Sequence, residues 1–393
     1  MADAPPVYDM PLMHTVDKHR SPPAIARAIL GDGDVELFRI AEGFYDIDVQ
    51  MFFSPDDIQL ISDSLVDNQL KGVAFGCCLA RFKDGTNVMF DAGPFGPLGA
   101  GGPGRHSHPC PDPPPFPLVE SLKSLGLAPK DVHFVVYSHV HGDHVGWAAT
   151  FTHAVHVMHR AEYEYAMFSG CPWHVPMRQL LEPLRAAGRL RLLDGEEAPI
   201  DVERLPGVSL LLVRGHTPGH ACVRLTARRT GDIAYYIGDA VHALAQLAIP
   251  QLTVSPVFDA CGWRNAKGKD VAKMWSPSLI ADARWSEQTS AVSRKALMDR
   301  AHFEKALLIS PHFPSPGIGR LQPIPPKRPE VFRLGTADVG DLCTPCNAYR
   351  CEMLPYEAPL PVPALSPSRR PMVVLAAAVA IAATAAAVYA GRK

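Results

Sequence analysis

The sequence predicts an α/β protein of layered sheets and helices, followed by a linker and a single terminal apolar helix. Three observations predict this organisation. Apolar or alternating runs of strand length recur between residues 35 and 309. Helical segments lie between and after these runs, which favours α/β layers over an all-β sandwich. Residues 372–390 form an apolar run without a charged residue. The chain has 393 residues, of which 47% are hydrophobic, enough to bury one large core or two smaller ones.

The first element that we expect is an irregular N-terminal arm over residues 1–30, which are polar and contain prolines. The expected strands are Val35–Ile40, Val73–Phe82, Asn87–Phe90, Val132–Tyr137, Val155–Met158, Ser209–Val213 and Ile233–Ile237. Helices are expected at Val119–Leu127 and at about Ser293–Leu307. Together these elements predict one folded domain over residues 31–322.

Residues 94–117 are too rich in glycine and proline to form a regular element, and they predict a loop or insertion. This segment contains His106 and His108. Because no further residue near them has the spacing of a ligand set, we interpret both as histidines of a solvated loop.

Residues 323–371 are rich in proline and predict a linker. They contain Cys343 and Cys346 in a CxxC arrangement, which can bind zinc or cycle as a disulfide. No second CxxC and no βαβ pattern accompany this pair, so incidental cysteines or a local disulfide are the favoured interpretation.

Residues 372–390 are long enough to cross a membrane, since a helix of this length spans roughly 28 Å at about 1.5 Å per residue. Arg369 and Arg370 precede the run, and Arg392 and Lys393 follow it. A buried or disordered Ala-rich tail is the alternative, because alanine is only weakly apolar. The run has no polar stripe, unlike a helix packed at the edge of a core. We therefore expect a single-pass C-terminal (tail) anchor.

Composition limits the cellular compartment and the classes of partner that we expect for this protein. Residues 1–20 contain no apolar segment of a secretory signal, and the nine cysteines are scattered, which predicts a catalytic domain on the cytosolic side. The 38 basic and 40 acidic residues nearly balance, and no long basic run points to nucleic acid. The oligomeric state stays open.

The most informative segment is His139-Val-His141-Gly-Asp143-His144. In extended chain, residues two apart point the same way, so His139 and His141 can converge on one ion. Gly142 would let the backbone turn sharply, which directs Asp143 and His144 toward a second ion. Imidazole and carboxylate ligands suit zinc, manganese or iron.

Further histidine and aspartate residues follow strand-like runs later in the chain. His216 lies in Gly-His-Thr-Pro-Gly-His, which ends at His220; Asp239 and His312 each follow another apolar run. Because loops at strand ends build sites along one edge of a sheet, we expect these side chains to meet the earlier cluster.

In these motifs the sequence resembles the metallo-β-lactamase superfamily, over roughly Val35 to Leu321. The resemblance implies a four-layer αββα sandwich with two divalent metal ions, zinc above all, with manganese or iron as alternatives. It places His139, His141 and His216 on one ion; it places Asp143, His144 and His312 on the other, with Asp239 bridging both. Asp91 would support the site, and His220 would be a supporting residue rather than a ligand.

A finer resemblance, to the lactonase and organophosphate-hydrolase branch, rests on the segment Gly238-Asp239-Ala-Val-His242, on Gln246 and Arg294, and on the turn after His312. Related lactonases place a tyrosine at the position of His242, so His242 would act as electrophile or general acid, or else as a packed supporting residue. Asp143 is counted as both ligand and catalytic residue. Aromatic candidates for an apolar pocket wall are Trp147, Phe151, Trp173, His174, Phe258 and Trp263.

The expected activity is metal-dependent hydrolysis of a small-molecule ester, preferably a lactone, in which an activated hydroxide attacks a carbonyl or phosphoryl centre. A glyoxalase-II-like thioesterase shares the ligand set and is the first alternative. A mono-iron sulfur dioxygenase uses fewer ligands on the same fold. A non-catalytic membrane-anchored scaffold would have lost ligands, and none is lost here.

Overall fold

The computed structural model describes residues 14–15, 25–49, 53, 58, 69–94, 117–168, 175–201, 203–249, 252, 277–324 and 348–354. The chain divides into two units, Met1–Pro359 and Leu360–Lys393, and all of these residues belong to the first.

The first sheet has eight strands in the order β1-β3-β4-β5-β6-β7-β8, and β2 also pairs with β3. The strands are β1 (His14–Thr15), β2 (Ile25–Leu30), β3 (Val35–Asp48), β4 (Gln69–Phe82), β5 (Asn87–Phe90), β6 (Phe134–Val136), β7 (Val155–His159) and β8 (Leu190–Leu193). The strands from β5 to β8 run parallel, and the earlier pairs are antiparallel. Parallel strands buried on both faces have continuous apolar sequences, which is why β5, β6 and β7 were predictable; the partly buried β8 was not among the expected strands.

The second sheet has seven strands in the order β15-β14-β13-β12-β11-β10-β9. They are β9 (Glu197–Asp201), β10 (Leu205–Leu212), β11 (Ala221–Thr226), β12 (Ile233–Tyr236), β13 (Leu307–Ile309), β14 (Ile318–Ile324) and β15 (Ala348–Met353). Only β12 and β13 pair in parallel, and a long excursion containing helices α6 (Ala245–Ala248) and α8 (Pro277–Phe303) connects them.

The buried side chains form three layers of core, and these show how the sheets and helices stack. One cluster contains inward-facing residues of both sheets, such as Phe90 and Tyr236. A second joins the outer face of the first sheet, including Met89, to helices α2 (Leu118–Ser124), α4 (Arg160–Phe168) and α5 (Val175–Ala186). A third joins the outer face of the second sheet to Leu297 and Met298 of α8.

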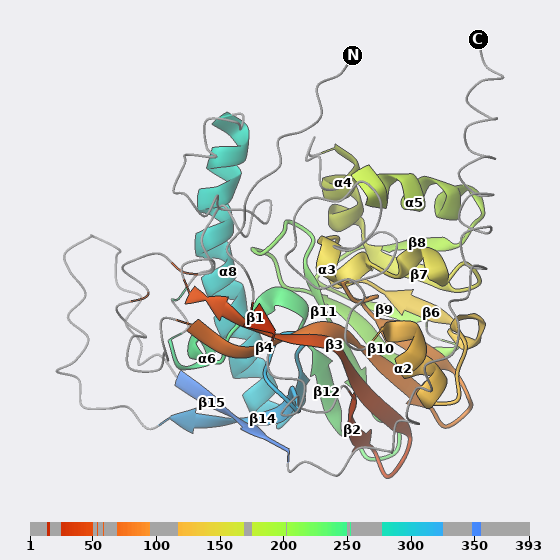
Figure 1. Ribbon diagram of the computed structural model, residues 1–393, viewed down its shortest axis with the longest axis horizontal. Helices are drawn as coiled ribbons and strands as arrows, with labels where there is room; N and C mark the ends of the chain where they lie inside the picture. The colour runs from red at the N-terminus through yellow and green to blue at the C-terminus, as the bar shows by residue number, and fades with distance from the viewer. Residues whose placement is uncertain are drawn as a thin grey trace. The chain divides into compact units, whose positions relative to one another are not determined.

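This stacking is the four-layer αββα arrangement that the sequence predicts. Figure 1 shows α8 on one side of the paired sheets and α4 and α5 on the other. Adjacent residues of β5 belong to different cores, because successive strand side chains point to opposite faces. The sheets are thus held between two helical layers.

Three short strands, β1, β2 and β15, lie where the sequence analysis predicted irregular chain. Ile25–Leu30, within the predicted arm, pairs along its whole length with β3, and its alternate residues are buried. Ala348–Met353, within the predicted linker, pairs with β14, and Tyr349 is buried. Both predictions are wrong at these residues, because a short edge strand of mixed polarity resembles a loop in sequence.

The predicted membrane helix, residues 372–390, lies outside the described residues, as do Cys343 and Cys346. Within the ranges given above, no helix is long and apolar enough to cross a membrane. The loop histidines His106 and His108 also lie outside the described part of the chain.

Candidate metal centre

Seven His and Asp side chains come together where the ends of strands from both sheets meet. They form two groups, His139, His141, His216 and Asp239 (the first ligand group) and Asp143, His144, Asp239 and His312 (the second ligand group), whose candidate ligand atoms lie within 4.8 Å of one another. Asp239 belongs to both groups. These are the seven residues that the sequence analysis assigned to metal, in the same division.

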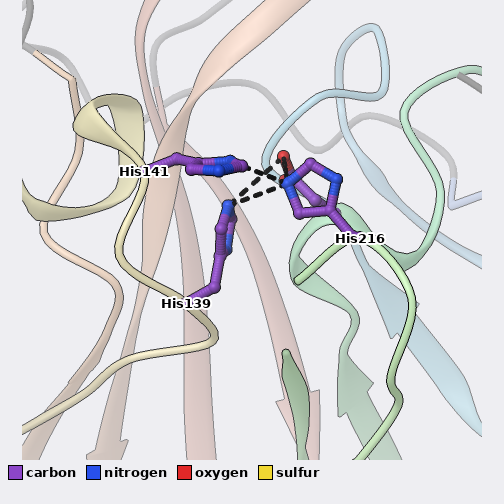
Figure 2. Close-up of side chains that lie close together, drawn as sticks. His139, His141 and His216 are labelled. Atoms are coloured by element: carbon purple, nitrogen blue, oxygen red, sulfur yellow. Dashed lines mark hydrogen bonds and ion pairs between the residues drawn. The ribbon is translucent and has the colours of Figure 1, made fainter. Parts of the chain in front are cut away.

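The three histidines of the first ligand group come from two loops. His139 and His141 follow β6, and His216 lies in the loop between β10 and β11. The Nε2 atom of His216 lies 3.0 Å from Nε2 of His139 and 2.9 Å from Nδ1 of His141. Figure 2 shows these three rings converging on one point.

The second ligand group takes its members from α3 (Gly142–Val145) and from the turns after β12 and β13. The shared carboxylate divides its oxygens between the groups. Oδ1 of Asp239 lies 3.0 Å from Nε2 of His144 and 2.9 Å from Nε2 of His312. Its Oδ2 lies 3.2 Å from Nε2 of His216.

Gly142 does not supply the sharp turn that the sequence predicted. It does not have a positive φ, and a Cβ atom added there would meet nothing within 4 Å. The change of direction comes instead from the start of α3, which begins at Gly142. A helix turn places consecutive side chains about 100° apart, so Asp143 and His144 reach the second ligand group from one short element.

Asp91 supports the centre through hydrogen bonds to Ser138, Tyr236 and His144. Its carboxylate accepts hydrogen bonds from the Ser138 backbone and hydroxyl, each at 2.7 Å, from Tyr236 Oη at 2.8 Å and from His144 Nδ1 at 2.7 Å. A carboxylate can only accept, so the Nδ1 proton of His144 points to Asp91 and Nε2 points to the centre. Asp91 adopts a positive φ of 59°, an unusual conformation that aspartate tolerates.

Other ligand histidines are oriented in the same way. Nδ1 of His312 donates to the carbonyl of Ala74 at 2.9 Å, which leaves Nε2 for the centre. Nδ1 of His139 lies 3.0 Å from the hydroxyl of Ser138, which itself donates to Asp91. Fixed tautomers of this kind are typical of histidines that bind metal ions.

His220 is positioned as a support. Its Nδ1 donates to the carbonyl of Val213 at 3.0 Å, and its Nε2 accepts the backbone N–H of Asp239 at 3.0 Å. Both ring nitrogens are therefore used, and burial lowers the pKa of His220 to about 3, which keeps the ring neutral. The hydrogen bond holds the backbone of the shared aspartate.

The electrostatics of the centre suit positive charge. Burial would raise the pKa values of Asp143 and Asp239, but the surrounding histidines, His144 first, lower both below their usual range. Burial likewise opposes charge on His144, yet the nearby carboxylates outweigh it and raise its pKa. The carboxylates of Asp143, which is partly buried, and of Asp239, which is buried, thus stay ionised among imidazole nitrogens.

The donor set also fits divalent ions in its spacing. Donors at about 2.0–2.2 Å from a tetrahedral ion lie roughly 3.3–3.6 Å from each other. Contacts from the Asp239 carboxylate to His216 and His139, at 3.2 and 3.6 Å, approach this spacing, and the shortest nitrogen contact, 2.9 Å, is somewhat less. The residues present therefore fit two ions that share one carboxylate.

His242 lies against both groups. Its Nε2 is 3.1 Å from Oδ2 of Asp239, and its ring stacks on that of His312 with centroids 5.7 Å apart. The backbone N–H of His242 donates to Oε1 of Gln246 at 2.8 Å. Arg294 and Gln246 both donate to the carbonyl of Leu252. His242, Gln246 and Arg294, the three residues of the finer motif, are thus linked by hydrogen bonds through Gln246 and Leu252.

The structure does not confirm that the aromatic residues named in the sequence analysis form one pocket wall. Phe151 is fully buried in the core between the first sheet and its helices, so it is a core residue. Trp147 packs beside that core and donates its Nε1 hydrogen to Glu42 at 2.7 Å. Trp173, His174, Phe258 and Trp263 lie outside the described residues.

Sequence reasoning missed an apolar cluster beside the centre. Its members are Val49, Phe53, Val73, Phe75, Ala243 and Leu252. The ring of Phe75 meets that of His312 edge to face, with centroids 5.1 Å apart. Phe75 lies within an expected strand, but no sequence pattern distinguishes it from the other core residues of that strand.

Comparisons with known proteins agree with this geometry. A 32% identical match over 116 residues, 30% of this chain and 42% of the relative, is to an N-acyl homoserine lactonase of Bacillus sp.. The lactonase AttM of Rhizobium radiobacter is 34% identical over 144 residues, 35% of this chain and 54% of the relative. The matches thus span about half the length of these curated relatives.

Solved structures share the fold at low identity. The hydrolase AbOPH of the beta-lactamase superfamily aligns with a TM-score of 0.58 at 16% identity, covering 86% of this chain and all of that chain. AidC, a dizinc quorum-quenching lactonase, aligns with a TM-score of 0.56 at 17% identity, covering 85% of this chain and 99% of that chain. The family model of the metallo-beta-lactamase superfamily matches residues 77–274, half of the chain. With its αββα layers and its paired His/Asp groups, the chain belongs to the metallo-β-lactamase superfamily.

Proposed function

We propose that the protein is a dinuclear-metal-dependent hydrolase of ester bonds, with a lactone as the favoured substrate. The observation that carries this proposal is the shared position of Asp239 between two complete ligand groups. The curated relatives are N-acyl homoserine lactonases, and the structural neighbour AidC is a dizinc lactonase, which supports the lactone class and two ions.

Zinc is the metal that we propose, with manganese or iron as alternatives, because the two groups together offer five imidazoles and two carboxylates. When bound, two such ions would supply a water molecule of lowered pKa and a Lewis acid for a carbonyl or phosphoryl oxygen. The protein contributes the fixed orientation of the donors, which Asp91, Ser138 and the Ala74 carbonyl enforce. Asp143 remains a proposed ligand and catalytic residue.

His242 is the proposed contact to the substrate. Its ring lies beside the shared carboxylate and parallel to His312, at the junction of the two groups. An imidazole there can donate a hydrogen bond to the substrate carbonyl or a proton to the leaving oxygen. The contact with Asp239 equally suits a role in holding that carboxylate, and the two roles differ in their effect on turnover.

The apolar cluster around Phe75 supports a substrate with an apolar substituent. The ring of Phe75 meets that of His312 edge to face, and Ala243, which follows His242 in the chain, belongs to the same cluster. An acyl chain attached to a lactone would find apolar contacts there, whereas a strongly charged substrate would not.

Two alternatives on the same fold remain testable. A glyoxalase-II-like thioesterase would use the same ligands, and only its substrate distinguishes it. A mono-iron sulfur dioxygenase uses fewer ligands, and the complete second ligand group, with His144 and His312, weighs against it.

The test combines metal analysis with a hydrolysis screen over lactones, thioesters and phosphotriesters. We expect close to two ions per chain and the highest kcat/KM on a lactone, both lost in Asp239→Asn. One iron per chain with oxygen uptake would replace the proposal with the dioxygenase. A clear preference for thioesters would replace it with the thioesterase.

A further inference from the structure

Two buried ionisable residues outside the ligand set, Glu162 and Arg39, hold the loops that carry the ligands. Both side chains are fully buried: Glu162 and Arg39 each have a relative exposure of 0%. Neither makes a salt bridge within the described part of the chain. Burying an ionisable side chain without an ionic partner costs free energy of folding unless hydrogen bonds compensate for the lost hydration. The hydrogen bonds of these two residues therefore indicate what each of them holds in place.

Glu162, in the first turn of α4, bridges the two loops of the first ligand group. Its Oε1 accepts the backbone N–H of Val140, which lies between His139 and His141, at 3.0 Å. Its Oε2 accepts the hydroxyl of Thr217 at 2.6 Å and the backbone N–H of Gly219 at 3.2 Å. Both acceptors of the carboxylate are therefore committed to segments that flank first-group ligands.

The approach of α4 to the second of these loops depends on a glycine. A Cβ atom at Gly219 would lie 2.0 Å from the backbone nitrogen of Glu162, a distance that no real contact allows. Gly219 thus lets the helix start come close enough for the carboxylate to reach Thr217. The loop and the helix start form one packed unit.

Arg39, in the middle of β3, holds the turn that carries His312. Its Nη2 donates to the carbonyls of Phe313 at 2.8 Å and Pro311 at 3.2 Å, and its Nε donates to that of Ser310 at 3.4 Å. These carbonyls lie on both sides of His312. Gly317, with a positive φ of 70°, allows the guanidinium to fit, because a Cβ there would lie 2.8 Å from Nε.

The two residues serve different ligand groups. Among the described residues, the hydrogen bonds of Glu162 reach the loops of His139, His141 and His216, and those of Arg39 reach the turn of His312. Asp91, by contrast, reaches both groups through Ser138 and His144. Glu162 thus supports the first ligand group, and Arg39 supports the second.

We propose that Glu162 and Arg39 are positioning residues, each specific to one of the two ion sites, so that either site can be weakened without the other. This inference rests on the proposed two-ion centre. It predicts that loss of Glu162 contacts weakens the site of the first ligand group, and that loss of Arg39 contacts weakens the site of the second. Changes to groups that orient ligands typically reduce metal affinity by about 10–100-fold.

The test compares Glu162→Gln and Arg39→Lys in the full chain, by titration with cobalt(II) and zinc(II) and by cobalt absorption spectra. Gln retains the size of Glu, but its amide NH₂ group is a donor and would face one of the N–H or O–H donors that the Glu162 carboxylate accepts. Lys retains the positive charge of Arg39 but lacks the planar guanidinium group that donates to several carbonyls at once. His216→Ala and His312→Ala give the reference spectra of single-site proteins. Glu164→Gln, exposed on the same helix, and Arg27→Lys, exposed on β2, are matched controls.

We expect one unaffected ion in each variant and one bound about 10–100-fold more weakly. When less cobalt is added than one ion per chain, Glu162→Gln should bind it in the second ligand group and give the same absorption spectrum as His216→Ala. Arg39→Lys should bind it in the first ligand group and give the same spectrum as His312→Ala. Equal weakening of both ions in either variant, or no weakening, would overturn the inference. A wild-type protein that binds fewer than two ions would instead overturn the proposed function.

Thermal unfolding of the metal-free proteins distinguishes positioning from a general loss of the fold. If either variant fails to fold, Thr217→Val replaces Glu162→Gln and Gly317→Ala replaces Arg39→Lys. Thr217→Val removes only one arm of the Glu162 contact, and Gly317→Ala places a Cβ 2.8 Å from Nε of Arg39, which displaces the guanidinium from the turn. The same assignment of weakened sites is expected, and equal weakening of both sites would again contradict it.

Discussion

His216 and His220 are four residues apart in one loop, yet their ring nitrogens face different partners. Nε2 of His216 points to His139, His141 and Asp239, whereas both nitrogens of His220 are satisfied by backbone groups. A pair of histidines in one motif therefore divides into a proposed ligand and a support, as the family resemblance implied.

His216→Ala and His220→Ala should differ in the number of ions bound at saturating metal. His216→Ala should bind one ion per chain, because the first ligand group loses a donor. His220→Ala should still bind two, with an unfolding free energy lower by about 1–3 kcal/mol, since the buried N–H of Asp239 loses its acceptor. Metal analysis and denaturant unfolding measure these quantities; one ion in both variants would show that His220 is a ligand.

His242→Ala tests whether that ring acts in catalysis or only in packing. If His242 contacts the substrate, kcat should fall by about 10²–10⁴-fold, the usual contribution of a general acid. The number of bound ions should stay at two, because His242 is outside both ligand groups. Steady-state kinetics and metal analysis are compared with His302→Ala, on the far end of α8; an unchanged kcat would end the catalytic proposal.

The ligands were predictable from sequence, because each follows an apolar run and the ends of such strands meet at one edge. Glu162 and Arg39 were not, since their partners are backbone groups of segments distant in sequence. The position of Arg39 carried no distinct signal, because its strand also contains Glu36, Glu42 and two aspartates. Only the fold shows what such a residue holds.

At the scale of elements, Glu42 joins β3 to the start of α2 and to Trp147. Its Oε2 accepts the backbone N–H of Leu118 at 3.2 Å and Nε1 of Trp147 at 2.7 Å. Its Oε1 is buried and has no hydrogen-bond partner among the described residues. Burial raises the pKa of Glu42 from 4.5 to about 8, so the side chain is protonated at neutral pH.

Glu42→Gln should flatten the pH dependence of stability. Between about pH 4.5 and 8 the folded protein retains a proton that the unfolded chain releases, so stability falls as pH rises, by about 1.4 kcal/mol per pH unit. Gln cannot ionise, and the variant should become the more stable protein above pH 8. Denaturant unfolding from pH 5 to 9 measures the difference, with Glu120→Gln on α2 as control; parallel curves for wild type and Glu42→Gln would contradict it.

The edge strands show where sequence patterns fail at this scale. β2 buries alternate residues against β3, and β15 buries Tyr349, but each has only six residues with arginine among them. Strands at the middle of the sheets such as β5, β6 and β12 were found because both of their faces are buried, although β11 was not among the expected strands. Edge strands bury less, so composition alone does not separate them from loops.

Tyr349→Ala measures what β15 contributes. The side chain is buried in the core with α8, and its hydroxyl donates to Asp299 at 2.9 Å. Its loss should lower the unfolding free energy by about 3 kcal/mol, as for other buried aromatic residues. Arg350→Ala, the exposed neighbour on the same strand, should change it by less than about 0.5 kcal/mol. Equal, small effects would indicate that residues 348–353 act as the linker that the sequence predicted.

At the scale of the whole molecule, the catalytic fold and the C-terminal run are separate questions. The four layers are formed by residues of the unit Met1–Pro359, and the apolar run belongs to Leu360–Lys393. Membrane attachment, with the catalytic domain on the cytosolic side, therefore remains a proposal that rests on sequence alone. Alanine contributes little to insertion, so the length of the run and its basic flanks carry the argument.

Deletion of residues 372–393 should release the protein from membranes with its activity intact. The apolar run would span roughly 28 Å as a helix, close to the thickness of a hydrocarbon core, whereas the remaining chain has no comparable segment in its described part. Deletion of residues 360–368 alone, which keeps the run and the preceding Arg369 and Arg370, is the matched control and should stay in the membrane fraction. Fractionation with an alkaline wash, followed by a hydrolysis assay of both fractions, gives the measurement. If the shortened protein still pellets with membranes, or if the full chain is found in the supernatant, the run is not an anchor.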